Sequence, residues 1–160
     1  MNKNNNGLIL FKGRSLINDM PIIVIATGLK AVTSNKKTGN MIQTWILYDG
    51  LEPHKAFKLR EYGSSVCGDC PHAGYNNNSC YVKWFHAPLN VYKAYKNNRY
   101  DYFDGDYEIF RDKSIRFGSC GDPTLIPIHI VKNIIEVSSN HTGYTHQWDK
   151  QFALAYRGLF

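Results

Sequence analysis

The sequence has no apolar run long enough for a secretory signal or a membrane span. Its first apolar stretch, Leu8 to Phe11, is short and follows the polar residues Met1–Asn6. A signal core needs about 7 to 15 apolar residues, and a membrane-spanning helix needs about 20. We therefore expect a cytoplasmic protein with no membrane partner, in a compartment that keeps cysteine thiols reduced.

The sequence also lacks internal repeats, and its only biased segment is the asparagine-rich start. Of its 160 residues, 43% are apolar and 20% are charged, which suffices for one domain that buries about two-thirds of its unfolded surface. The 19 Lys and Arg residues exceed the 13 Asp and Glu residues, giving a net charge of +6. This excess permits an anionic partner without requiring one. We expect a single domain over residues 1–160.

Cysteine is scarce, but it is concentrated in one place. Cys67, Cys70 and Cys80 lie close together in the chain, and the fourth and last cysteine is Cys120. A C-x2-C pair with a third cysteine nearby is typical of a metal or iron–sulfur site, because neighbouring thiolates repel one another unless a cation lies between them. The sequence therefore predicts a metal-binding loop at residues 66–82, with Cys120 as a candidate fourth ligand.

The cysteines alone leave the identity of the metal open. Zinc takes four ligands, and His72, His86 or Cys120 would complete such a set; the second C-x2-C pair of a zinc ribbon is missing. A [4Fe–4S] cluster accepts three cysteines and leaves one iron for an outside ligand, or takes Cys120 as its fourth. A dithiol redox pair and plain buried cysteines are further alternatives.

The start of the chain predicts antiparallel strands. Apolar and β-branched residues at Leu8–Ile17 and Pro21–Leu29 flank the turn-forming pair Asn18-Asp19, which indicates a hairpin. A turn at Asn35–Gly39 then precedes a strand at Met41–Tyr48.

The second half of the chain predicts a βαβ unit. A helix at Pro88–Lys96 comes first, because its apolar residues recur at helical spacing. A strand at Ser114–Ser119, and a strand with its exit loop at His141–Trp148, then enclose a helix at Pro123–Val137, and two strands joined in this way are parallel. We expect an α/β or α+β fold with an antiparallel start and a βαβ second half.

Three polar residues follow or lie on the strands of this unit, where α/β proteins collect their chemistry. We predict that Asp122, His146 and Arg116 bind a cofactor, with Arg116 neutralising cluster charge. Each has a structural alternative. Asp122 could cap the helix that follows it, His146 could serve in packing or hydrogen bonding, and Arg116 could form a surface salt bridge.

A rival function comes from the segment between Tyr75 and Arg111, where aromatic and basic residues interleave. Rings that stack on bases, set among cations that neutralise phosphates, are the ingredients of single-strand binding. Nucleic acid is therefore an alternative partner, with the metal site in a structural role. The residues concerned are Tyr75, Tyr81, Trp84, Tyr92, Tyr95, Tyr100, Tyr102, Phe103 and Tyr107, with Lys83, Lys93, Lys96 and Arg99.

Five motifs, in this order along the chain, resemble those of an uncharacterised family of bacteriophage and plasmid proteins. They are Asn35–Leu47, Val66–His72 (VCGDCPH), Cys80–Val82, Arg116–Pro123 and Thr142–Trp148 (TGYTHQW). That family is in turn distantly similar to the cysteine-rich, radical-SAM-like barrel proteins of phages.

The resemblance implies a phage-encoded protein that acts in the host cytoplasm and carries an iron–sulfur cluster, with [4Fe–4S] favoured over zinc. It implies a redox or electron-transfer role with an unidentified electron or protein partner, and it allows a partial (β/α) barrel. The family has no assigned activity, so whether the chain is an enzyme stays open. Its C-x2-C-x9-C spacing also differs from the C-x3-C-x2-C loop that holds the S-adenosylmethionine cluster.

Overall fold

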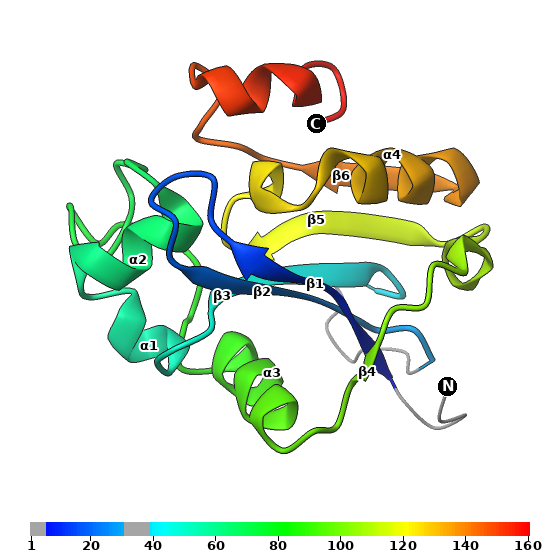
Figure 1. Ribbon diagram of the computed structural model, residues 1–160, viewed down its shortest axis with the longest axis horizontal. Helices are drawn as coiled ribbons and strands as arrows, with labels where there is room; N and C mark the ends of the chain where they lie inside the picture. The colour runs from blue at the N-terminus through cyan, green and yellow to red at the C-terminus, as the bar shows by residue number, and fades with distance from the viewer. Residues whose placement is uncertain (1–5, 31–38) are drawn as a thin grey trace.

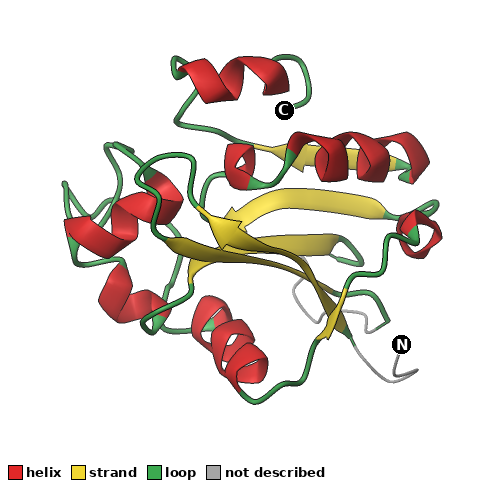
Figure 2. Ribbon diagram, viewed as in Figure 1, coloured by secondary structure: helices red, strands yellow, loops and turns green. Residues whose placement is uncertain are grey.

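The computed structural model describes residues 6–30 and 39–160, which form a six-stranded sheet with helices around it (Figures 1 and 2). The strand order is β4-β1-β2-β3-β5-β6. The strands are β1 (Gly7–Arg14), β2 (Pro21–Thr27), β3 (Ile42–Tyr48), β4 (Asp101–Tyr102), β5 (Ser114–Cys120) and β6 (Asn140–Gly143). The turn predicted at Asn35–Gly39 lies outside the described residues apart from Gly39.

The pairing of the strands confirms the expected fold class. Strands β1, β2 and β3 pair antiparallel, as predicted for the start of the chain. Strand β5 pairs parallel with both β3 and β6, so β5, the following helix and β6 form the predicted βαβ unit. Within the described residues the sheet is open, with β4 and β6 at its two edges.

The centre of the sheet is covered on both faces. Five consecutive residues of β2, Ile22 to Ala26, are completely buried, and a strand whose alternate side chains are all buried must have packing on either side. In Figure 1 the sheet crosses the middle of the molecule, with helix α4 above it and helix α3 below it. The hairpin between β1 and β2 turns at Asp19, which has the left-handed φ of 58° that Asp tolerates.

The α-helices are α1 (Pro53–Ala56), α2 (Arg60–Cys67), α3 (Ala87–Lys96) and α4 (Ile128–Val137), and the 3-10 helices are η1 (Tyr107–Phe110), η2 (Pro123–Leu125) and η3 (Gln151–Tyr156). Helix α3 confirms the prediction at Pro88–Lys96. Helices α1 and α2 were not expected from the sequence. None of the helices in the described part of the chain is both long enough and apolar enough to span a lipid bilayer.

Two predicted elements are shorter than expected. The helix expected at Pro123–Val137 is divided into η2 and α4, because Pro127 holds the preceding Ile126 in an extended conformation (φ −78°, ψ 130°). The segment His141–Trp148, expected to hold a strand and its exit loop, is a strand only as far as Gly143. Beyond it, the His146 N–H donates to the Asp122 carboxylate instead of pairing with a strand of the sheet.

A bulge in β5 sets the position of its last residues. Between two matched pairs, Gln43 with Arg116 and Trp45 with Cys120, β3 advances two residues and β5 advances four. Gly118 takes up the extra length with a left-handed φ of 66°, and its N–H donates to the Thr44 hydroxyl at 2.9 Å. Bulges of this kind redirect side chains near functional sites, and here the bulge lies between Arg116 and Cys120.

Candidate functional site

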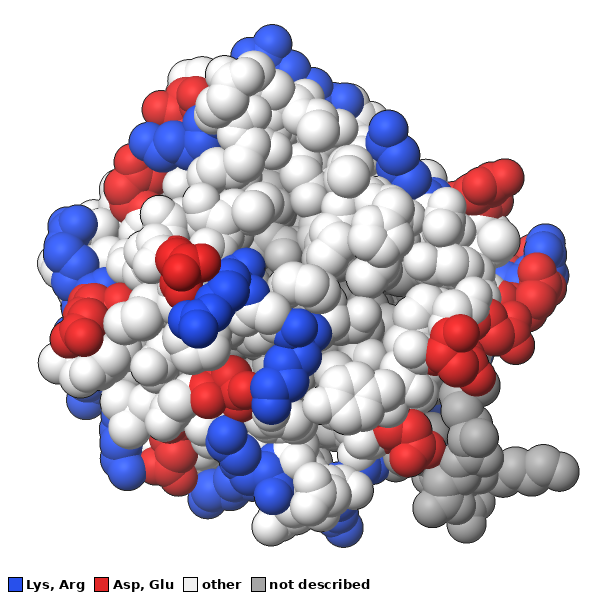
Figure 3. All heavy atoms as spheres, viewed as in Figure 1, with Lys and Arg blue, Asp and Glu red and all other residues white. Residues whose placement is uncertain are grey.

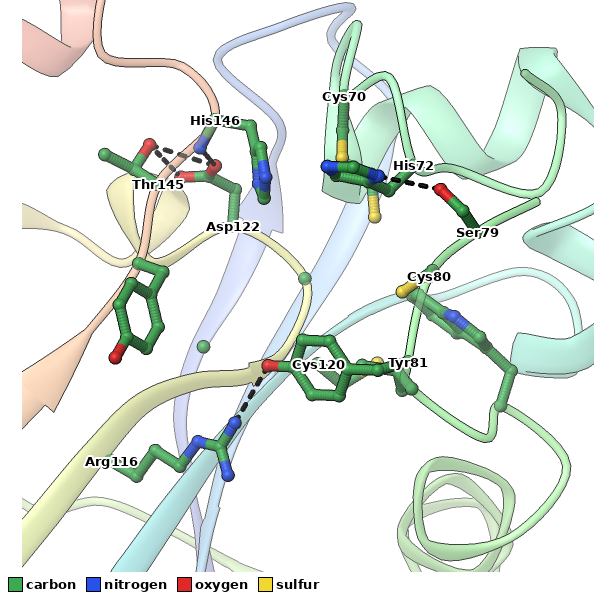
Figure 4. A pocket seen from close by; sticks show the side chains of 16 residues that line it. Cys70, His72, Ser79, Cys80, Tyr81, Arg116, Cys120, Asp122, Thr145 and His146 are labelled. Atoms are coloured by element: carbon green, nitrogen blue, oxygen red, sulfur yellow. Dashed lines mark hydrogen bonds between the residues drawn. The ribbon is translucent and has the colours of Figure 1, made fainter. Parts of the chain in front are cut away.

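One pocket of about 580 Å³ brings together the four cysteines and the three residues predicted to bind a cofactor, with His72 but without His86 (Figure 4). In Figure 4, Cys70 and Cys80 lie on one side of this pocket, whereas Arg116 and Asp122 lie on the other. We call this space the cysteine pocket. The seven residues are Cys67, Cys70, Cys80, Cys120, Arg116, Asp122 and His146.

Helix α2, the loop that follows it and strand β5 carry the cysteines into the pocket. Cys67 is the last residue of α2, and Cys120 is the last residue of β5. Cys70 and Cys80 lie in the loop that follows α2, which is drawn together where the Cys80 N–H donates to the His72 carbonyl at 2.9 Å. All four are free thiols, and the chain has no other cysteine.

The backbone around the C-x2-C pair is fixed by residues from distant motifs. The Val66 carbonyl accepts from the Asp122 N–H at 2.7 Å, and the Cys67 carbonyl accepts from Gln147 Nε2 at 3.1 Å. The Gly68 carbonyl accepts from the Tyr75 hydroxyl. Two of these three successive carbonyls therefore have partners from distant segments and the third has one from the same loop, so the sulfur atoms start from a well-defined scaffold.

The environment of the thiols disfavours bare thiolates. Burial raises the pKa of the Cys67 thiol, and the Cys70 and Cys80 sulfurs and Asp122 raise it further. Burial likewise raises the pKa of Cys120, with smaller contributions from Cys67 and Cys80. These mutual effects mean that the sulfur atoms lie near one another. A bound cation would reverse the effect and favour the thiolate form.

Cys70 differs from the other two, because part of its environment favours the thiolate. Burial raises the pKa of the Cys70 thiol, whereas the backbone N–H groups of His72 and Ala73 lower it. Backbone N–H groups that favour the thiolate form of a cysteine are also among the features that tune iron–sulfur centres.

The arrangement of the ligands bears on the kind of metal. Within residues 6–30 and 39–160, no three His, Cys, Asp or Glu side chains are grouped closely enough to hold one metal ion. A single zinc ion binds each sulfur at about 2.3 Å and so draws its ligands within about 4 Å of one another. A cluster spaces its thiolates more widely, since each binds a different iron. Four thiols around a shared space are donors that either kind of centre could use.

An unpartnered donor also faces this space. Trp84 lines the pocket, and its Nε1–H is buried without a hydrogen-bond partner among the described residues. The indole is held in place by stacking on Phe57, with ring centroids 4.2 Å apart. A buried donor without an acceptor costs about 1–3 kcal/mol. An occupant of the pocket with acceptor atoms, such as sulfide, would remove this cost.

Asp122 is engaged by the protein itself. Its carboxylate is 95% buried and accepts hydrogen bonds from the Thr124 N–H at 3.1 Å and hydroxyl at 2.7 Å, the Thr145 hydroxyl at 2.8 Å and the His146 N–H at 2.8 Å. Asp122 thus caps η2, the structural alternative raised above, and joins the end of β5 to the loop after β6. The predicted convergence of these two segments is confirmed.

His72 and His146 lie at the mouth of the pocket, with ring centroids 5.4 Å apart. The Ser79 hydroxyl donates to Asn77 Oδ1 at 2.7 Å, so His72 Nδ1, 2.7 Å from the same hydroxyl, carries the proton and donates to it. His72 Nε2 is then an acceptor. Figure 4 shows this Nδ1 contact.

Some residues of the site have no distinguishing pattern in the sequence. Trp84 and Gln147 were not predicted to serve the cysteines, and Tyr81 was considered only as a base-stacking ring. Tyr81 could have been suspected as a pocket residue because it directly follows Cys80. Trp84 could not, because an aromatic residue near a helix is usually part of the core.

The nucleic-acid alternative finds little support in these positions. Trp84, Tyr92 and Tyr95 are buried in the core, so their rings are not available to stack on bases. Of the rings named for this role, Tyr81 and Tyr102 are well exposed. Figure 3 shows basic and acidic side chains interspersed on the visible face, without a large area of one sign.

Comparison with known proteins adds no relative: no family model, no curated protein and no solved structure matches the chain. The resemblance to phage and plasmid proteins therefore stays an expectation from the motifs.

Proposed function

We propose that this protein binds an iron–sulfur cluster, [4Fe–4S], through Cys67, Cys70 and Cys80 and serves in redox chemistry or electron transfer in the cytoplasm. The observation that carries the proposal is that every cysteine of the chain lines one pocket as a free thiol. Chance placement of core cysteines gives no reason for Cys120, at the end of β5, to line the same pocket as the three cysteines of residues 67–80.

The fourth ligand position belongs either to Cys120 or to an outside molecule. Cys120 is buried, and its neighbours Cys67 and Cys80 affect its pKa, which supports membership of the ligand group. Its place at the end of β5, across the pocket from the loop, supports a more distant role. The motif resemblance, with three cysteines in the loop, favours an open fourth iron.

The residues around the cysteines have roles of their own in this proposal. A bound cluster supplies one-electron chemistry or a Lewis-acidic iron. The backbone N–H groups of His72 and Ala73 lower the pKa of Cys70, and Trp84 offers a further donor. Gln147 and Tyr75 hold the backbone at Cys67 and Gly68. Donors of this kind stabilise added negative charge on the sulfur atoms.

The test is anaerobic purification of the full chain, followed by iron, sulfide and zinc analysis. We expect a brown protein whose visible absorbance is bleached by dithionite. Cys67→Ser, Cys70→Ser and Cys80→Ser should each lose the cluster, and His86→Ala, a matched change at an exposed residue outside the pocket lining, should retain it.

Cys120→Ser distinguishes the two forms of the site. Retention of the cluster in this variant indicates an open iron, and its loss makes Cys120 the fourth ligand. A colourless protein with one zinc per chain would replace the cluster with a structural zinc site. A protein free of metal after anaerobic reconstitution with iron and sulfide would contradict the proposal altogether.

A further inference from the structure

The cysteine pocket is larger than a cluster requires. A [4Fe–4S] core has eight atoms, and if each takes about the volume of a water molecule, ~30 Å³, the core leaves about half of the 580 Å³ unfilled. The sulfur-bearing residues Cys70 and Cys80 lie on one side of this space, and Arg116 and Thr145 lie on the other (Figure 4). A second occupant therefore has room beside the first.

Arg116 places a positive charge without a counter-ion on the side of the pocket opposite Cys70 and Cys80. Its side chain is half-buried, and its hydrogen bond goes to a neutral group, the Tyr81 hydroxyl, 2.8 Å from Nη2. All 13 acidic residues of the chain lie in the described segments, and none of the ion pairs found among them involves Arg116. A guanidinium at the pocket wall without a counter-ion attracts a carboxylate or phosphate.

The acidic residue of the pocket lining does not act as a counter-ion to Arg116. Asp122 is the single carboxylate among the pocket-lining residues. Its two oxygens already accept hydrogen bonds from Thr124, Thr145 and His146. The positive charge of Arg116 is therefore left for a ligand.

Tyr81 completes the recognition of an anion. Its hydroxyl oxygen accepts from Arg116, so its own hydrogen is directed elsewhere and can be donated to a second acceptor. Its ring also lies at the pocket mouth with Tyr144, and the two rings are 69% and 73% exposed. Exposed aromatic faces at a pocket mouth suit a planar ligand.

Resting on the cluster assignment above, we propose that Arg116 and Tyr81 form a binding site for a small planar ligand bearing a carboxylate or phosphate, held beside the cluster. The guanidinium and the phenol bind the anionic group, and the rings of Tyr81 and Tyr144 flank the planar part.

The experiment compares anions with neutral partners of the same shape. Calorimetry on the cluster-loaded chain measures benzoate against benzamide, and AMP against adenosine. We expect at least one anion to bind about tenfold or more tightly than its neutral counterpart. Arg116→Gln should weaken that anion about ten- to hundredfold, as expected for a charged hydrogen bond, and Arg116→Lys should weaken it less. Arg99→Gln, at an exposed residue outside the pocket, should change nothing.

Iron and sulfide content, measured on every variant, separates this proposal from the one before it. If the wild-type chain forms no cluster, the cluster assignment fails. If wild type and Arg116→Gln both hold the cluster and neither anion is preferred, the anion site alone is overturned. The same holds if the preference survives in Arg116→Gln. Loss of the cluster from Arg116→Gln also overturns the site, because Arg116 would then serve the charge of the cluster.

Discussion

The side-chain amide of Gln147 donates a hydrogen bond to the main-chain carbonyl of Cys67, 3.1 Å away and 80 residues earlier in the chain. Gln147 is 1% exposed, so this contact is made in the interior. It connects the loop after β6 to the end of α2, and it makes the geometry of the first cysteine depend on a residue with no metal chemistry of its own.

Gln147→Ala should release this connection. The Cys67 carbonyl would keep its hydrogen bond from the Cys70 N–H at 3.2 Å, so loss of the bond from Gln147 should lower the free energy of unfolding by about 0.5–1.5 kcal/mol. Urea denaturation measures this loss, and the rate of cluster loss in air should rise in parallel. Gln151→Ala, at an exposed position, should leave both values unchanged. An equally small effect of both substitutions would show that Gln147 does not stabilise the backbone at Cys67.

Gly68→Ala should destabilise the C-x2-C loop. Gly68 has φ 58° and ψ −134°, a region essentially reserved for glycine, and an added Cβ would overlap the Gln147 side chain. Gly105 provides the control, because its φ is also positive (93°) but an added Cβ would meet nothing within 4 Å. Gly68→Ala should lower the free energy of unfolding by about 1–3 kcal/mol and by more than Gly105→Ala does. Equal losses would mean that backbone strain alone acts at Gly68.

Trp84→Phe should distinguish the contribution of the indole N–H from that of the aromatic ring. Phenylalanine can keep the stacking on Phe57 but removes the unpartnered donor. If the donor binds cluster sulfur, its removal disfavours the more negative reduced state. An anaerobic redox titration should show a midpoint potential lower by a few tens of millivolts, on the order of one weak hydrogen bond.

Trp148→Phe is the control for this substitution, since Trp148 is 70% exposed and lies outside the pocket lining. Without metal, Trp84→Phe should unfold no more easily than wild type, because it removes a buried unpaired group. An unchanged midpoint potential would show that the Trp84 N–H does not interact with the cluster.

Asp49 should make stability depend on pH in the acid range. Burial opposes its ionisation, but hydrogen bonds from Lys96, Lys12 and Tyr95 prevail and lower the pKa of Asp49 below its ordinary value. A carboxylate whose pKa is lower in the folded state stabilises the fold above its unfolded pKa of about 3.9, and the contribution disappears as the pH falls through the folded value.

Asp49→Asn should therefore destabilise the protein at pH 7, by about 1–3 kcal/mol, and flatten the loss of stability below about pH 4. Because both lysines are half-exposed, salt should reduce the difference. Glu136→Gln, at an exposed position on α4, is the matched control. Parallel pH profiles for wild type and Asp49→Asn would show that the hydrogen bonds to Asp49 do not govern stability in acid.

The chemistry-bearing residues could be predicted from the sequence because they are rare types in short motifs. Four cysteines, and the polar residues after β5 and β6, were enough to predict which segments would meet. Helix α2 could not be predicted from the sequence pattern. Gly63 and two serines within it have low helix propensity, and the helix is held instead by distant contacts such as the hydrogen bond from the Ser15 hydroxyl to the Ser65 carbonyl at 2.6 Å.

The exact use of Asp122 was likewise undecided by the sequence. Gly-Asp-Pro is compatible with a ligand-binding carboxylate and with a helix cap, and the choice depends on whether donors from another segment arrive. Thr145 and His146 do arrive, at a distance along the chain that no local pattern reports.

The carboxylate of Asp122 and the hydroxyl of Thr145 form a tie that neither residue maintains alone. Loss of Asp122 leaves the Thr145 hydroxyl and the His146 N–H without this acceptor, and loss of Thr145 removes one donor from a buried carboxylate, so selection should act on the two together. Among homologues that keep a cysteine pocket, replacements at 122 and 145 should appear as coordinated exchanges. A lineage that abandoned the cysteines would be released from that constraint.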